Sequence, residues 1–175
     1  MSQGRENPTV PLELHRISGQ PLPLIVFRGA LPLDGDPGGT CEALFAGNGW
    51  GGGWQNGIYS YHHFHATTHE VLGIARGHAK VRFGGDEGPL VEVAAGDVVV
   101  IPAGISHKKE GGSADLLVVG AYPGEREPDM QRGLPHEHPT AAAKASRVPV
   151  PATDPVFGAE GPLLRHWSGA DRARG

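Results

Sequence analysis

Residues Gly57–Gly77 read GIYSYHHFHATTHEVLGIARG and contain three of the four side chains that we predict to bind one metal ion. His63 and His65 are two residues apart, so on a strand their imidazoles point to the same face. Glu70 follows five residues later, which leaves enough chain for a turn and a return. The fourth candidate, His107, comes after the segment GDVVVIPAG. Three imidazoles and one carboxylate suit a divalent first-row metal such as Fe, Mn, Zn or Ni.

The rest of the chain reads as one all-β domain. Its 28 glycines and 16 prolines punctuate short apolar runs, which is typical of turns between strands. No helix of the length that joins parallel strands intervenes, so an antiparallel sandwich or barrel is expected. The predicted strands are residues 22–28, 57–65, 70–76, 79–83, 90–93, 98–101 and 115–121.

Helices and irregular segments are expected around these strands. Thr40 is predicted to cap a short helix over residues 41–46, and the glycine-rich run 47–54 is predicted to lack regular structure. Residues 139–147 can form a short helix, whereas 161–167 could be a last strand or an anchored tail. The predicted organisation is an N-terminal arm (1–21), a barrel (22–123) and a C-terminal segment (124–175) that wraps the barrel or a partner subunit.

Two spaced patterns surround the candidate metal ligands. The first is Gly57, His63, His65, Glu70 and Gly77, and the second is Gly96, Pro102, Gly104 and His107, with eighteen residues between the two. These patterns resemble the two conserved motifs of the cupin superfamily, whose two His and Glu in the first motif and His in the second bind one metal. The final Asn of the second motif is replaced by Gly111, but that Asn is not a ligand.

A closer resemblance covers residues 22–167. The stretches WQNGIYSYHHFHATTHEVLGIARG, VRFGG, GDVVVIPAGISHK and VPVPATDPVFGAEGPLL are similar to the YjlB-like cupins, which are small bacterial proteins without an assigned reaction. The resemblance implies a cupin (RmlC-like) jelly-roll β-barrel with short peripheral helices. It implies one divalent metal ion per chain, bound by His63, His65, Glu70 and His107.

The remaining histidines and two tyrosines have open roles. Strand alternation turns Tyr59 and Tyr61 toward the metal, where they either orient substrate or fill the barrel. The same alternation turns His62 and His69 away from it. His136 and His138 lie in the polar run PHEHP, which is either a loop or part of a lid.

Composition and charge limit the function further. A net charge of −4 argues against a nucleic-acid partner, and no apolar run is long enough to span a bilayer. The single Cys41 excludes an internal disulfide and fits a reducing cytoplasm. The extended segments 1–21 and 148–167 favour a homodimer, because a second barrel could cover them.

A metalloenzyme acting on a small polar organic molecule is the leading functional hypothesis. Within the superfamily that the chain resembles, dioxygenase-type oxidation is the first expectation. The alternatives are a metal-dependent isomerase or lyase and a non-catalytic cupin that binds a small ligand.

Overall fold

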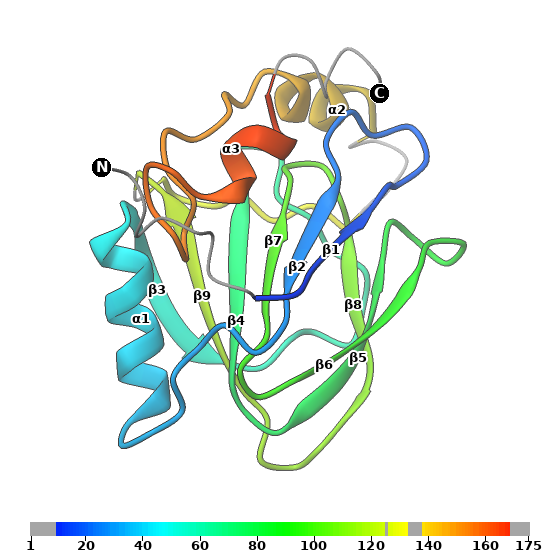
Figure 1. Ribbon diagram of the computed structural model, residues 1–175. Coiled ribbons are helices and arrows are strands. Elements are labelled where there is room, and N and C mark those ends of the chain that lie inside the picture. The colour runs from blue at the N-terminus through cyan, green and yellow to red at the C-terminus, as the bar shows by residue number, and fades with distance from the viewer. Residues whose placement is uncertain (1–9, 125, 133–137, 169–175) are drawn as a thin grey trace.

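The centre of the molecule is a pair of antiparallel sheets (Figure 1). The computed structural model describes residues 10–124, 126–132 and 138–168. The strands are β1 (Leu12–His15), β2 (Leu24–Phe27), β3 (Trp50–Asn56), β4 (Glu70–Arg76), β5 (His78–Phe83), β6 (Leu90–Ala94), β7 (Val98–Ile101), β8 (His107–Gly112) and β9 (Leu117–Pro123). The helices are α1 (Pro37–Gly47), α2 (His138–Ser146) and α3 (Pro162–His166). The large sheet has the order β1-β2-β7-β4-β9-β3 and the small sheet the order β6-β5-β8.

Both faces of the central strands β2, β7 and β4 are buried, and strand alternation divides the core into two clusters. Along β4, Val71 and Ala75 belong to the outer cluster, whereas Leu72 and Ile74 belong to the inner one. The inner cluster also holds side chains of the small sheet, so it fills the space between the sheets. Glu70 is in step with Leu72 and Ile74 and therefore faces the barrel interior. The predicted all-β fold with short peripheral helices is confirmed.

The outer cluster is covered by α1 and by the C-terminal segment. Cys41 and Phe45 of α1 pack on the large sheet over Gly73, where a β-carbon would collide with the cysteine sulfur. Trp167 is fully buried, and its indole N–H donates to the Pro23 carbonyl at 2.9 Å. Residues 161–167, predicted to be a last strand or an anchored tail, therefore include helix α3 and are anchored on the protein's own sheet.

The predicted strand over residues 57–65 is wrong. Tyr59 accepts a hydrogen bond from the Lys109 amide, and His63 exchanges two hydrogen bonds with His107. Between these points one chain advances four residues while β8 covers two. The mismatch forces the extra residues out of register, so only isolated bridges form, and a continuous ladder does not.

Other local predictions also need correction. The glycine-rich run 47–54, predicted to be irregular, largely lies in edge strand β3, which pairs with β9 through a bulge after Gly51. Strand β8 was not predicted, because its sequence HKKEGG carries no alternating apolar signal. The expected cap Thr40 lies inside α1, which begins earlier because Asp36 accepts the Gly39 amide at 3.1 Å and Pro37 opens the first turn. Residues 12–15 of the predicted arm form β1.

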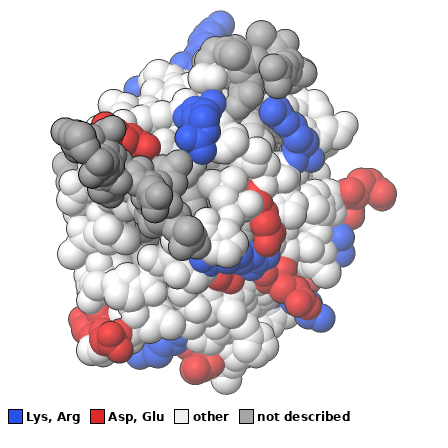
Figure 2. Space-filling model, in the orientation of Figure 1, with Lys and Arg blue, Asp and Glu red and all other residues white. Residues whose placement is uncertain are grey.

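The charged side chains do not separate by sign on the face shown in Figure 2, where acidic and basic residues are intermixed. Within the described residues, every helix is too short or too polar to cross a bilayer.

Candidate metal centre

Three buried histidines converge inside the barrel. His63, His65 and His107 each offer a ring nitrogen, and these atoms lie within 4.8 Å of one another. Their exposed fractions are 5%, 7% and 2%, so the imidazoles are largely shielded from water. Imidazole nitrogens at this spacing are ligands that divalent transition metals prefer. These three histidines could therefore hold a metal ion.

The Glu70 carboxylate lies beside the three rings. Its Oε1 is 3.3 Å from Nε2 of His65 and 3.3 Å from Nε2 of His107. The carboxylate is only 2% exposed, and Oε1 has no hydrogen bond of acceptable geometry. A buried carboxylate oxygen without such a partner is costly unless a cation approaches it. The residues present thus fit a bound divalent ion, which would also satisfy Glu70.

Strand ends and a bridge bring these residues together from distant parts of the sequence. Glu70 is the first residue of β4, and His107 is the first residue of β8. His63 is bridged to His107, and the His65 carbonyl accepts the Gly104 amide at 2.9 Å. The ligand segment, residues 62–65, is therefore held by hydrogen bonds to β8 and to the loop before it. This explains how an irregular segment can still orient two imidazoles.

Hydrogen bonds fix which ring nitrogen faces the centre. Nδ1 of His65 donates to the Asp129 carbonyl at 2.6 Å, which leaves Nε2 free. Nδ1 of His63 donates to the Tyr61 carbonyl at 3.3 Å. The Asp129 carboxylate in turn accepts the amides of Ala66 and Thr67 at 2.8 and 3.0 Å. Bonds of this kind orient metal-binding imidazoles. Asp129 was not predicted, because nothing in its local sequence connects it to His65, 64 residues away.

Electrostatics keep the centre ready for a cation. Burial, followed by the charge of His107, lowers the pKa of His63 to about 4. Burial by itself would raise the pKa of Glu70, but the close contacts with His107 and His65 and their positive charge outweigh it and lower that pKa. Burial lowers the pKa of His65, but Glu70 outweighs it and raises that pKa. At neutral pH His63 is therefore neutral and Glu70 is ionised.

Tyr122 is a residue of this site that the sequence prediction missed. It is 5% exposed, and its ring meets His65 edge to face at 5.9 Å. The Trp54 indole donates to its hydroxyl at 2.8 Å. Because an indole N–H can only donate, the Tyr122 proton is left for the Glu70 carboxylate. Burial and the Glu70 charge raise the pKa of Tyr122, so it stays protonated. The predicted strand ended at Ala121, one residue too early to place Tyr122 in the barrel.

A cavity of about 450 Å³ opens onto the four candidate ligands. Its lining includes Tyr59, which is 52% exposed and lies at the mouth. Tyr61 is not among the lining residues; its ring stacks on Tyr59 at 4.8 Å and lies under the Arg132 guanidinium at 3.6 Å. A catalytic role for either tyrosine stays a prediction.

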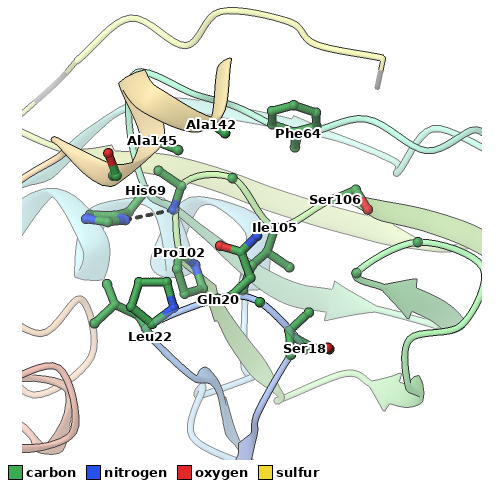
Figure 3. Close-up of a pocket in the computed structure, with 18 of the residues that line it drawn as sticks. Ser18, Gln20, Leu22, Phe64, His69, Pro102, Ile105, Ser106, Ala142 and Ala145 are labelled. Atoms are coloured by element: carbon green, nitrogen blue, oxygen red, sulfur yellow. Dashed lines mark hydrogen bonds between the residues drawn. The ribbon is translucent and has the colours of Figure 1, made fainter. Parts of the chain in front are cut away.

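A second cavity of about 510 Å³ lies on the other side of the ligand segment (Figure 3). His62, Phe64 and His69 line it, and helix α2 closes it with Ala142 and Ala145. His69 uses both ring nitrogens: Nδ1 accepts the Ala103 amide at 2.9 Å, and Nε2 donates to the Pro149 carbonyl at 3.0 Å.

Two further histidines of the sequence prediction are not placed. His136 and the side chain of His138 lie outside the described residues.

Cys41 does not take part in the centre. It is fully buried under α1, against the outer face of the large sheet. Burial, followed by the charge of Glu42, raises the pKa of its thiol to about 12. Since closed structural zinc sites usually rely on cysteine thiolates, the donor set here differs from theirs.

One relative decides the family. The uncharacterized protein YjlB of Bacillus subtilis (strain 168) is 40% identical over 153 residues, which are 87% of this chain and 90% of that protein. The chain belongs to the YjlB-like cupins. The sequence matches no family model.

Solved structures are similar to this YjlB-like cupin only at a distance. Acireductone dioxygenase from Bacillus anthracis, solved with a cadmium ion in its active center, is 20% identical with a TM-score of 0.36; the match covers 50% of this chain and 59% of that one. RmlC from Streptococcus suis, in complex with dTDP-D-xylose, is 15% identical with a TM-score of 0.39; the match covers 65% and 70% of the two chains. Similarity at this level transfers no activity.

Proposed function

We propose that this YjlB-like cupin is a mononuclear metalloenzyme that oxidises a small organic molecule in a dioxygenase-type reaction. His63, His65, His107 and Glu70 would hold one divalent ion. The observation that carries the proposal is the convergence of three buried imidazoles and one carboxylate at a cavity of about 450 Å³. Four protein ligands leave coordination positions for other molecules, as catalytic sites do and closed structural sites do not.

The chain's own residues would prepare the site for this chemistry. When bound, the metal supplies Lewis acidity and, as iron(II), a centre for reaction with oxygen. The Tyr122 hydroxyl, whose pKa the Glu70 charge helps to raise, keeps a proton that it would donate to the carboxylate and so help to orient it. Leu72 and Tyr122 line the cavity with apolar surface, which limits water around the reacting atoms. The Asp129 carbonyl holds the His65 ring in place.

The test is anaerobic reconstitution with iron(II), followed by measurement of oxygen consumption on a panel of small organic molecules. We expect substrate-dependent oxygen uptake by wild type and none by His65→Ala. Equal uptake by both proteins would contradict the proposal. A metal-loaded, open site that is inert with every metal and substrate class would favour the ligand-binding alternative.

A homodimer and a cytoplasmic location stay predictions. Within the described residues β1 pairs only with β2 and is the edge of the large sheet. Its Leu14 side chain is 39% exposed, so a second copy would have an edge and an apolar side chain to cover. Sedimentation at micromolar concentration should give a dimer, and a monomer of 18.3 kDa would contradict the prediction.

A further inference from the structure

The charges and walls of the metal cavity restrict its substrate. We infer, on the basis of the proposed function, that the substrate is a molecule with an aromatic or apolar body and a single oxygen-bearing head. The head binds the metal and carries at most one negative charge, and the body carries none. This substrate differs from the small polar molecule expected from sequence, because only its head is polar.

The walls favour an apolar body. Most of the wall is apolar or aromatic: Trp54, Ile58, Leu72, Tyr122 and Pro128 line the cavity together with the candidate ligands. Gln55 and Asn56 also line it, and the Gln55 amide is already bonded to Glu42 at 3.1 Å. The indole and phenol groups that could have bound a polar substrate are already bonded to each other, since the Trp54 N–H donates to the Tyr122 hydroxyl. Apolar ligand surface placed against these side chains leaves water at a gain of about 25 cal/mol per Å².

The charges disfavour a second anionic group on the substrate. The ionisable lining residues besides the histidines and tyrosines are Glu70 and Asp129, and none of the described lining residues is a lysine or an arginine. Two nearby arginines lie outside the lining: Arg126 donates to the Thr67 carbonyl at 3.2 Å, and the Arg132 guanidinium lies over the Tyr61 ring at 3.6 Å. A carboxylate on the substrate body would lose its water without meeting a cation, which is costly. One negative charge at the head is different, because a divalent ion beside a single carboxylate keeps one uncompensated positive charge.

The mouth of the cavity provides a second, independent indication. Tyr59 is 52% exposed and Met130 is 45% exposed, and both line the cavity. They are two of the five large apolar side chains that are exposed among the described residues. Two such side chains at one opening form a surface that an apolar ligand body would cover.

Catechols that share one chelating head test this inference. We would load the untagged protein with Co(II) and follow the cobalt absorption during titration with catechol, tert-butylcatechol and protocatechuate, whose ring bears a carboxylate. Each affinity is divided by the affinity of the same probe for free Co(II), which corrects for the acidity of its hydroxyls. We expect tert-butylcatechol to bind most tightly. The corrected affinity of protocatechuate should be lower than that of catechol by a factor of about ten or more.

Variants show which side chains cause the differences in affinity among the three catechols. Met130→Arg places a cation at the mouth and should remove most of the penalty for protocatechuate. Tyr59→Ala should weaken tert-butylcatechol more than catechol. Leu90→Ala is the matched control, because Leu90 is another exposed apolar side chain, 41% exposed, on β6 and outside the cavity lining. All three variants should retain the wild-type cobalt content.

The outcomes separate the substrate class from the proposed function. Protocatechuate binding as tightly as catechol would overturn the substrate class and leave the open metal site intact. Bound cobalt that responds to none of the three probes, or a protein that takes up no cobalt, would overturn the proposed function and the substrate class with it.

Discussion

Two cavities lie back to back in this molecule, and the same short segment forms part of the wall of each. His63 and His65 face the cavity of about 450 Å³, whereas His62 and Phe64 face the one of about 510 Å³. The next pair of residues repeats the pattern: the candidate ligand Glu70 faces the first cavity, and its neighbour His69 faces the second.

The histidines of the two cavities differ in how their ring nitrogens are used. His69 has both nitrogens in hydrogen bonds to backbone groups. His62 has Nε2 2.7 Å from the Asp86 carboxylate, and its Nδ1 is buried without a partner but meets no other candidate ligand among the described residues. Nε2 of His65 instead faces another imidazole and an unsatisfied carboxylate oxygen. A buried histidine therefore indicates a metal centre only where ring nitrogens converge without partners. A histidine whose nitrogens are already bonded serves the fold.

Removing the metal should have the largest effect. An ion bound only by the folded state stabilises it by about 4 kcal/mol when its free concentration is a thousand times Kd. We expect a chelator to lower the melting temperature and to increase amide exchange around His63, His107 and β4 more than around His69. Equal changes in amide exchange around the two cavities would contradict the assignment of the metal to only one of them.

The two sides of the ligand segment should respond differently to alanine. His65→Ala should lower metal affinity more than hundredfold, since loss of a group that only orients a ligand already costs about 10–100-fold. His62→Ala should leave affinity near wild type. Metal content after dialysis, measured by elemental analysis, is the readout. Equal loss in both variants would mean that the assignment of the two faces is wrong.

His69→Ala should lower stability without lowering metal affinity, the opposite of what we expect for His65→Ala. It leaves the Ala103 amide and the Pro149 carbonyl without their partner and should lower the free energy of unfolding by about 1–3 kcal/mol. Metal content should be unchanged. Denaturant unfolding and elemental analysis on the same samples would check this, and a loss of metal in a folded His69→Ala protein would count against the distinction.

Tyr122→Phe should have a smaller effect on the metal. The phenylalanine keeps the ring contact with His65 and removes the hydroxyl proton that is available to Glu70. We expect affinity to fall about tenfold, with a change in the cobalt absorption spectrum that reports the altered carboxylate. Trp54→Phe is the control, since it removes the indole donor to Tyr122 and leaves the Tyr122 hydroxyl in place. An unchanged spectrum in Tyr122→Phe would argue that Tyr122 serves packing alone.

Asp129→Asn should have the smallest effect, and one that depends on pH. Burial raises the pKa of Asp129, but bonds from Gln131, Thr67 and Ala66 outweigh it and lower the pKa below its ordinary 3.8. A lowered pKa contributes stability that is present above the ordinary value and is lost as pH falls through the folded-state value. Wild type should therefore melt slightly above the variant at pH 7, and the difference should vanish on acidification. A difference that grows in acid would contradict this sign.

The apolar strands and the candidate metal ligands could be proposed from sequence because their signals are local. A short run of β-branched residues between turn residues, such as Val98–Ile101, is typical of a buried strand, and the spacing around His63 and Glu70 is distinctive. The strand over residues 57–65 could not be judged, because its failure depends on a register mismatch with β8. Strand β8 itself is polar and is held in the small sheet by its backbone pairing with β5.

Residues that support the ligands were harder to predict. Asp129 reaches His65 from a segment with no periodic pattern. Tyr122 follows directly on the predicted strand 115–121, so the same alternation would have turned it toward the barrel interior had the strand been extended. Supporting contacts of this kind depend on the tertiary fold, and only extension of a strand's alternation could have suggested Tyr122.

The most direct test of the metal centre is anomalous diffraction from crystals of protein loaded with zinc or manganese. We predict one anomalous peak per chain among the ring nitrogens of His63, His65 and His107, next to Glu70. At least one further coordination position should be filled by water or an added ligand from the cavity. A loaded crystal without a peak at this place, or an ion saturated by protein side chains with no opening to solvent, would contradict the account.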